Sequence, residues 1–159
     1  MIARKSLSIG LALALVVCVS TAATPGSDSP TPWFLTSSAQ FSLGEIELVQ
    51  LAIERAQDSA VRDFAKRMVA DFGQKNAELQ QLAQTKGWRL PLNAGDWIRV
   101  DQILAHTPAA KFDRVYMHEV YVDHRNAQAT MRNYVQTGPD PDLKQWATQT
   151  IPMFREHLQ

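Results

Sequence analysis

The chain has 159 residues, with 16 basic and 16 acidic side chains and a formal net charge of zero. This length favours one domain, or one domain with a tail, and a hydrophobic content of 45% with 20% charged residues is typical of a globular protein. The balanced charge argues against nucleic-acid binding, which a basic excess or a basic stripe would indicate.

The first 23 residues have the pattern of a secretory signal peptide. Arg4 and Lys5 form a positive start, and residues 9–19 are an apolar run that is too short to span a bilayer comfortably. Small residues of the kind that signal peptidase requires follow at 20–23. We therefore expect export with cleavage after Ala22 or Ala23; an uncleaved membrane anchor is the alternative, which the short apolar run disfavours.

The single cysteine, Cys18, lies inside this apolar run. It follows Val17, whereas a lipoprotein signal places its cysteine after a small residue, so we do not expect lipidation. Cleavage at the expected position would remove Cys18. The mature chain would then have no disulfide and no thiolate for catalysis or metal binding.

Residues 24–37 are rich in proline, serine, threonine and glycine. Such a segment does not carry enough apolar surface to order itself. We predict that it is a flexible linker between the signal peptide and a domain that occupies residues 38–159. Trp33 and Phe34 are the linker residues that would pack against the domain.

Two amphipathic helices are predicted next, over about residues 38–56 and 59–86. Ser38 is the expected N-cap of the first, and Gly87 is the expected C-terminal stop of the second. Apolar residues recur every three to four positions on one face of each segment. They are Phe41, Leu48, Val49, Ala52 and Ala56, then Val61, Phe64, Ala65, Met68, Phe72, Leu79, Leu82 and Ala83.

Two further helices are predicted over about residues 108–136 and 141–158. Thr107 is expected to cap the first, with Pro108 in its first turn, and Asp140 is expected to cap the second. The inward residues are Phe112, Val115, Tyr116, Val120, Ala127, Met131 and Tyr134, then Leu143, Trp146, Ala147, Ile151, Phe154 and Leu158.

The lengths of the links predict how these helices are connected. The first and second helices, and the third and fourth, are joined by very short links, which force antiparallel hairpins. The link over residues 87–107 is longer and contains an amphipathic piece at 96–105, either a short helix capping the bundle or a crossover along its side. No segment alternates as a strand would. We therefore predict an all-α four-helix bundle of two antiparallel hairpins, with a short extra helix in the link.

Ionisable residues also fall on the predicted inner faces. At 100° per residue, Glu45, Asp123 and His157 point inward at similar heights in three helices, while Phe72 occupies the matching position of the fourth. His124 flanks the apolar stripe of its helix. In one interpretation, His157 pairs with Glu45 or Asp123 inside the bundle, because a buried charge needs a partner.

In the other interpretation, the same cluster binds a single metal ion. The candidate ligands are Glu45, Asp123, His124 and His157. A di-metal carboxylate site is not expected, because such bundles use Glu-x-x-His pairs and the chain has none. No serine–histidine–aspartate arrangement, phosphate-binding loop or Gly-x-Gly-x-x-Gly motif is visible, so we expect neither an enzyme active site nor an organic cofactor.

Several short segments follow one another in a characteristic order along the predicted helices. They comprise residues 44–48, Leu51 and Ala52; Val61, Phe64, Ala65, Met68, Val69 and Asp71; Phe112, Asp113, Tyr116 and residues 122–124; and Leu143, Lys144, Ile151, Pro152, His157 and Leu158. In this order they resemble a bacterial family, domain of unknown function 4142, over about residues 39–158. Members are often labelled predicted outer membrane protein.

The resemblance implies a ferritin-like four-helix bundle in the cell envelope, periplasmic or associated with the outer membrane, without an established activity. Relatives commonly have histidine where this chain has Phe72, and Pro152 matches the family pattern. The leading hypothesis is a non-catalytic envelope protein that acts through binding or assembly, with another envelope protein or a second copy as partner. The alternative is a metal-binding or redox protein with a degraded mid-bundle site. Membrane association is not indicated.

Overall fold

The computed structural model describes residues 30–95 and 98–159, so the predicted signal peptide and residues 24–29 lie outside the described residues. Five helices are present there: α1 (Pro30–Arg55), α2 (Ser59–Lys86), α3 (Ile98–Ala105), α4 (Ala109–Thr137) and α5 (Pro141–His157). None of them combines the length and the apolar character needed to cross a membrane.

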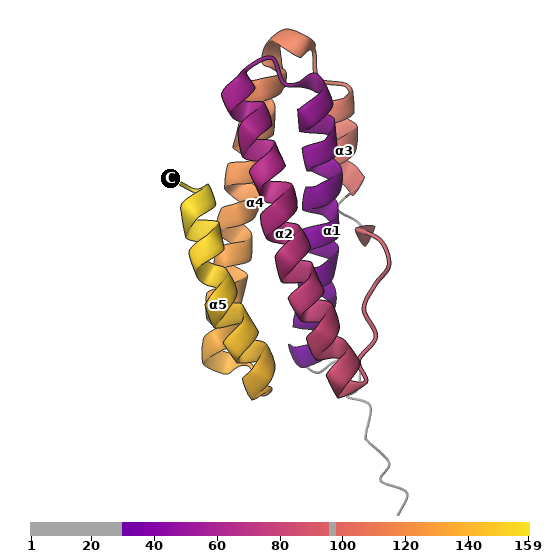
Figure 1. Ribbon diagram of the computed structural model, residues 1–159, viewed down its shortest axis with the longest axis vertical. Coiled ribbons are helices and arrows are strands. Elements are labelled where there is room, and N and C mark those ends of the chain that lie inside the picture. The colour runs from indigo at the N-terminus through magenta and orange to yellow at the C-terminus, as the bar shows by residue number, and fades with distance from the viewer. Residues whose placement is uncertain (1–29, 96–97) are drawn as a thin grey trace, which may run out of the picture.

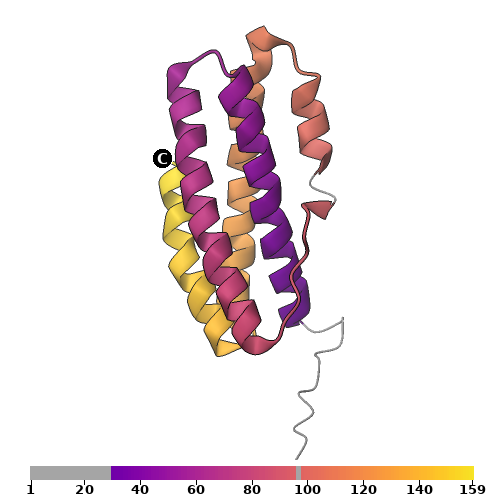
Figure 2. The ribbon, with the colours of Figure 1, turned by 45° about the vertical axis from the view of Figure 1, so that its right-hand side comes forward.

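The four long helices form a bundle of two antiparallel hairpins (Figure 1). Helices α1 and α2 make one hairpin and α4 and α5 make the other, which confirms the predicted all-α four-helix architecture. After α2 the chain returns along α1 to α3, which packs against α1 and α4 (Figure 2). The long link is therefore a crossover along the side of the bundle and not a cap over its end.

Side-chain and glycine caps mark several helix ends. Gly87 ends α2 in the left-handed conformation, with φ 69°, and the Asp140 carboxylate accepts a hydrogen bond from the Leu143 amide at the start of α5, so both predicted caps are confirmed. The prediction for Thr107 is wrong. The Thr107 hydroxyl donates a hydrogen bond to the Ile103 carbonyl in the last turn of α3. Helix α4 starts after Pro108 without a side-chain cap.

The predicted linker needs correction at its C-terminal end. Helix α1 starts at Pro30, so residues 30–37 are helical, and Ser38 is a buried interior residue of α1 rather than its N-cap. Phe34 is fully buried and its ring stacks on Tyr134 of α4, with 3.9 Å between centroids. The Thr31 and Tyr134 hydroxyls lie 3.0 Å apart. Packing against the second hairpin orders a segment whose composition alone predicts disorder.

Arg55, in the last turn of α1, attaches α3 to the bundle. Its guanidinium donates to the carbonyls of Leu104, Ala105 and Thr107 at 2.6, 2.8 and 2.6 Å. The same group lies over the Phe112 ring of α4, 4.8 Å from its centroid. One side chain thus satisfies carbonyls at the C-terminal end of α3 that have no partner inside the helix.

Candidate functional site

Three polar side chains from three helices meet in the middle of the bundle, and we name them the histidine array: Asp71 of α2, His157 of α5 and His124 of α4. His157 Nε2 lies 2.8 Å from Asp71 Oδ2, and His157 Nδ1 lies 3.1 Å from His124 Nε2. The Asp71 side chain is 37% exposed and that of His157 is 2% exposed, whereas His124 is fully buried. The array therefore runs from the surface into the core.

Aromatic rings enclose the inner end of this array. The rings of Phe41, Phe72 and Phe154 lie 6.1, 5.6 and 5.5 Å from the His124 ring, all at steep interplanar angles. Phe72 is also 5.8 Å from the His157 ring. Edge-to-face contacts of this kind fix ring orientation, and the rings surround the fully buried His124 imidazole with apolar surface.

Burial controls the charge of His124. Together with the neighbouring His157, it lowers the pKa of His124 to about 3, and the Val120 carbonyl one turn earlier opposes both effects. His124 is therefore neutral at physiological pH. An ionised Asp71 only accepts hydrogen bonds, so His157 Nε2 must carry the hydrogen that joins this pair. The His157–His124 bond then exists with either residue as donor, according to whether His157 is protonated.

The two other predicted site residues lie outside these hydrogen bonds. Both ring nitrogens of His157 are engaged by Asp71 and His124, so the predicted pairing of His157 with Glu45 or Asp123 is wrong. Glu45 is buried. The pKa of Tyr116 is raised first by the burial of Tyr116 and second by the charge of Glu45. Asp123 is 8% exposed. Burial, followed by the charge of Glu119, raises its pKa to about 6.

The donor set does not fit a closed metal site. Within residues 30–95 and 98–159, no three His, Cys, Asp or Glu side chains are grouped so that they would hold a metal ion. His124 and His157 are joined by a hydrogen bond, and the rings of Phe41, Phe72 and Phe154 lie around them. A bound metal ion stays a prediction of the sequence.

Asp71 is the member of the histidine array that the inner-face argument does not predict. It lies at the edge of the buried face of α2, beside Phe72, where helical periodicity does not separate it from solvated carboxylates. The only sequence signal for Asp71 is its place among the residues that carry the family resemblance. The helical period places His124 at the flank of its apolar stripe, whereas in the structure its side chain is fully buried.

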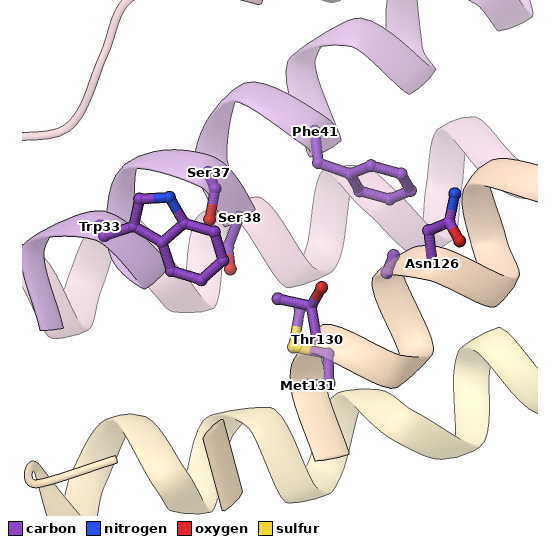
Figure 3. A pocket seen from close by; sticks show the side chains of 8 residues that line it. Trp33, Ser37, Ser38, Phe41, Asn126, Thr130 and Met131 are labelled. Atoms are coloured by element: carbon purple, nitrogen blue, oxygen red, sulfur yellow. The ribbon is translucent and has the colours of Figure 1, made fainter. Parts of the chain in front are cut away.

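A second feature is a surface hollow between α1 and α4, which we name the α1–α4 groove (Figure 3). Its volume is about 160 Å³. It is lined by Trp33, Ser37, Ser38 and Phe41 of α1 and by Asn126, Ala127, Thr130 and Met131 of α4. None of these side chains is ionisable at physiological pH, and Trp33 is 60% exposed.

The position of α3 explains why this groove is open. Helix α3 packs on both α1 and α4 and is attached at Arg55, the C-terminal end of α1 (Figure 2). The groove lies toward the opposite end of α1. Its Phe41 ring also contacts the rings of Phe72 and His124, so this ring lines the groove and adjoins the histidine array.

Comparison with known proteins gives a family and a fold. A family model described as Domain of unknown function (DUF4142) matches residues 17–159. The chain is also similar to a crystal structure of a DUF305 fragment from Deinococcus radiodurans, with a TM-score of 0.70 and 17% sequence identity, covering 86% of this chain and 92% of that chain. At that identity the likeness shows the fold alone. No curated protein matches the chain.

Proposed function

The chain belongs to the domain of unknown function 4142 family, whose model matches nearly its whole length, and from this premise we propose that it is an exported cell-envelope protein that works by binding rather than by catalysis. The observation that carries the proposal is the contrast between the histidine array, which is polar, and the α1–α4 groove, which is apolar. His157 is hydrogen-bonded through Nδ1 to His124 and through Nε2 to Asp71, whereas the α1–α4 groove presents apolar rings and no acid or base.

This contrast separates binding from catalysis in chemical terms. General acid–base or nucleophilic catalysis needs an ionisable group within hydrogen-bond reach of the reacting atoms. The groove supplies hydroxyl and amide groups only. An apolar hollow with a few polar groups at its rim is, however, the usual form of a small-molecule binding site.

The export part of the proposal is supported by the N-terminal sequence. Arg4, Lys5, the apolar run 9–19 and the small residues 20–23 are the parts of a cleavable signal. We propose that the processed protein resides in the periplasm or at the outer membrane.

Intact-mass measurement tests the export part. The full chain is produced in a Gram-negative host, fractions are separated, and the N-terminus of the protein is determined. We expect a chain that begins at Ala23 or Thr24 outside the cytoplasm, and a Leu13→Arg control that keeps Met1 because its apolar run is broken. A wild-type chain that keeps Met1 would sink the proposal of export.

Native mass spectrometry of the exported protein tests the binding part. Wild-type protein released gently from the envelope should carry a non-covalent small ligand, and a Thr130→Phe variant, in which a ring fills the groove, should carry less of it. Wild-type and variant protein that are equally free of ligand would contradict a binding role for the groove.

The metal-binding alternative is favoured by one observation, the 3.1 Å approach of the two imidazole nitrogens. Metal analysis of protein purified without chelators or a histidine tag decides it. Stoichiometric metal that is lost in His157→Ala would favour a metal site over binding alone. Metal-free protein that is nevertheless destabilised by His157→Ala would assign the array a structural role.

A further inference from the structure

The α1–α4 groove is formed by two facing rows of side chains, and what we infer about its ligand rests on the proposed binding function. Trp33, Ser37 and Phe41 are spaced four residues apart, so they form one row along α1. Ala127 and Met131 form the facing row on α4. Ser37 lies between the rings of Trp33 and Phe41 along α1, so the hollow has a small side chain at its middle and a large ring toward each end (Figure 3).

Trp33 is not needed to build the core. The next two residues, Phe34 and Leu35, are 0% and 3% exposed, whereas Trp33 is 60% exposed and stands at the end of the groove. Exposed tryptophan rings are costly in water, and covering one is among the larger apolar gains available to a ligand. The ring is therefore placed where a bound molecule would bury it.

The volume of the groove indicates the size of the ligand part that it would enclose. An apolar cavity of about 150 Å³ holds a benzene molecule, and the groove measures about 160 Å³. A single ring with a short substituent, roughly six to ten non-hydrogen atoms, is the matching size. A flat face for a second copy would instead have to bury about 1,000 Å² or more.

The chemistry of the lining limits the charge of the ligand. No ionisable side chain lines the groove, so a charged ligand would lose hydration without gaining a counter-charge. The Ser37 hydroxyl already donates to the Phe34 carbonyl, which leaves its oxygen as an acceptor. Asn126 and Thr130 add a few hydrogen-bonding groups near the rim. The groove is thus suited to a ring with at most one or two polar groups.

We propose that the α1–α4 groove binds a small uncharged ring-containing molecule, with its ring between Trp33 and Phe41 and against Ala127 and Met131. The ligand would be aromatic or alicyclic and would approach from the open side of the α1–α4 seam.

Binding of three matched probes to the processed full protein tests this proposal. Benzyl alcohol, benzylammonium and benzoate have similar size and differ in charge. Their binding is followed by ¹⁵N–¹H NMR of the Trp33 indole N–H and of the Ala127 and Thr130 amides. We expect saturable binding of benzyl alcohol with a Kd on the order of 0.1–1 mM, as suits so small a ligand. The two charged probes should bind at least about tenfold more weakly.

Two phenylalanine variants place the binding in the groove. Thr130→Phe puts a ring into the hollow and should abolish the shifts, whereas Thr148→Phe, the same change on an exposed position of α5, should leave them as in wild type. Trp33→Ala should weaken benzyl alcohol binding several-fold without unfolding the protein, because its side chain is mostly exposed.

The remaining outcomes overturn the proposal. Absence of benzyl alcohol binding, equal binding of all three probes, or binding that persists in Thr130→Phe would each do so. A dimer in sedimentation that Thr130→Phe dissociates would assign the groove to a second copy instead. Native mass spectrometry separates this failure from that of the proposed function: a long-chain lipid retained by wild type but not by Thr130→Phe would keep the binding role and reject the ring-sized ligand.

Discussion

Asp123 and His124 are consecutive buried residues of α4, and burial acts on their pKa values in opposite directions because it penalises the charged form of each. With a contribution from Glu119, it raises the pKa of Asp123 to about 6; with a contribution from His157, it lowers the pKa of His124 to about 3. Acid therefore favours the folded state through the carboxyl group and disfavours it through the imidazole.

Replacing Asp123 by asparagine isolates the first effect. The folded pKa, about 6, is above the ordinary 3.8, so the stability from this group is complete below pH 3.8 and is lost as the pH rises through 6. Asparagine does not ionise. Measured by urea unfolding from pH 4 to 7, the stability of Asp123→Asn relative to wild type should rise by about 1–3 kcal/mol. The exposed Asp63→Asn control should show no such rise, and a pH-independent difference for Asp123→Asn would contradict the assignment.

His124→Phe isolates the second effect. The folded pKa of His124, about 3, is below the ordinary 6.5, so as the pH falls below 6.5 the unfolded chain binds a proton that the folded chain does not. This lowers wild-type stability by up to about 1.4 kcal/mol per pH unit. At pH 7 the variant should be less stable by about 1–3 kcal/mol, because His157 Nδ1 loses its partner. Urea unfolding at pH 5 should show a smaller deficit, and the exposed His118→Phe should show no change of this kind.

At the scale of the elements, the attachment of α3 depends on Arg55. A lysine has one ammonium group and does not reach the three carbonyls of Leu104, Ala105 and Thr107 with the forked geometry of a guanidinium. In Arg55→Lys, amide hydrogen exchange in α3 should accelerate about tenfold or more while exchange in α2 and α5 stays near the wild-type rate. Arg114→Lys, an exposed change on α4, is the control. Uniform acceleration across all helices would mean that Arg55 stabilises the whole bundle instead.

Local signals predicted most of the helices. The bounds expected for α2, α4 and α5 agree with the structure to within about one residue, because Gly87 and Asp140 mark ends and the apolar period is continuous. The start of α1 was placed at Ser38 rather than at Pro30, because proline, serine and threonine dominate that stretch by composition. What orders it is Tyr134, a residue of another helix, and a local pattern does not contain that information.

The candidate site was predicted less well for the same reason. His124 and Asp123 are 100° apart on α4, so a small rotation of the helix in the assembled bundle decides which of them faces the centre. Asp71 gains its role only through His157, 86 residues later in the chain. The α1–α4 groove depends on where α3 stops covering the seam. The orientation of His124, the contact of Asp71 and the position of the groove all depend on how the two hairpins pack together, and the period of a single helix does not contain that information.

For the whole molecule, the first turns of α1 join the two hairpins. Phe34→Ala should destabilise the protein by about 3–5 kcal/mol in thermal or urea unfolding, because it removes a fully buried ring stacked on Tyr134. Trp33→Ala is the matched control on the adjacent residue and should change stability by less than about 1 kcal/mol, since Trp33 is 60% exposed. Equal effects of the two changes would restore the interpretation of this stretch as a linker.

Phe41 gives the molecule one further property. The same phenyl ring is a wall of the surface hollow and a neighbour of the neutral His124 imidazole. If an occupant displaces that ring, the electrostatic environment of the imidazole changes, and thermodynamic reciprocity requires protonation of His124 to alter the occupant's affinity by the same factor. The Phe41 ring would then couple the protonation of His124 to ligand binding in the hollow, so that the affinity depends on pH.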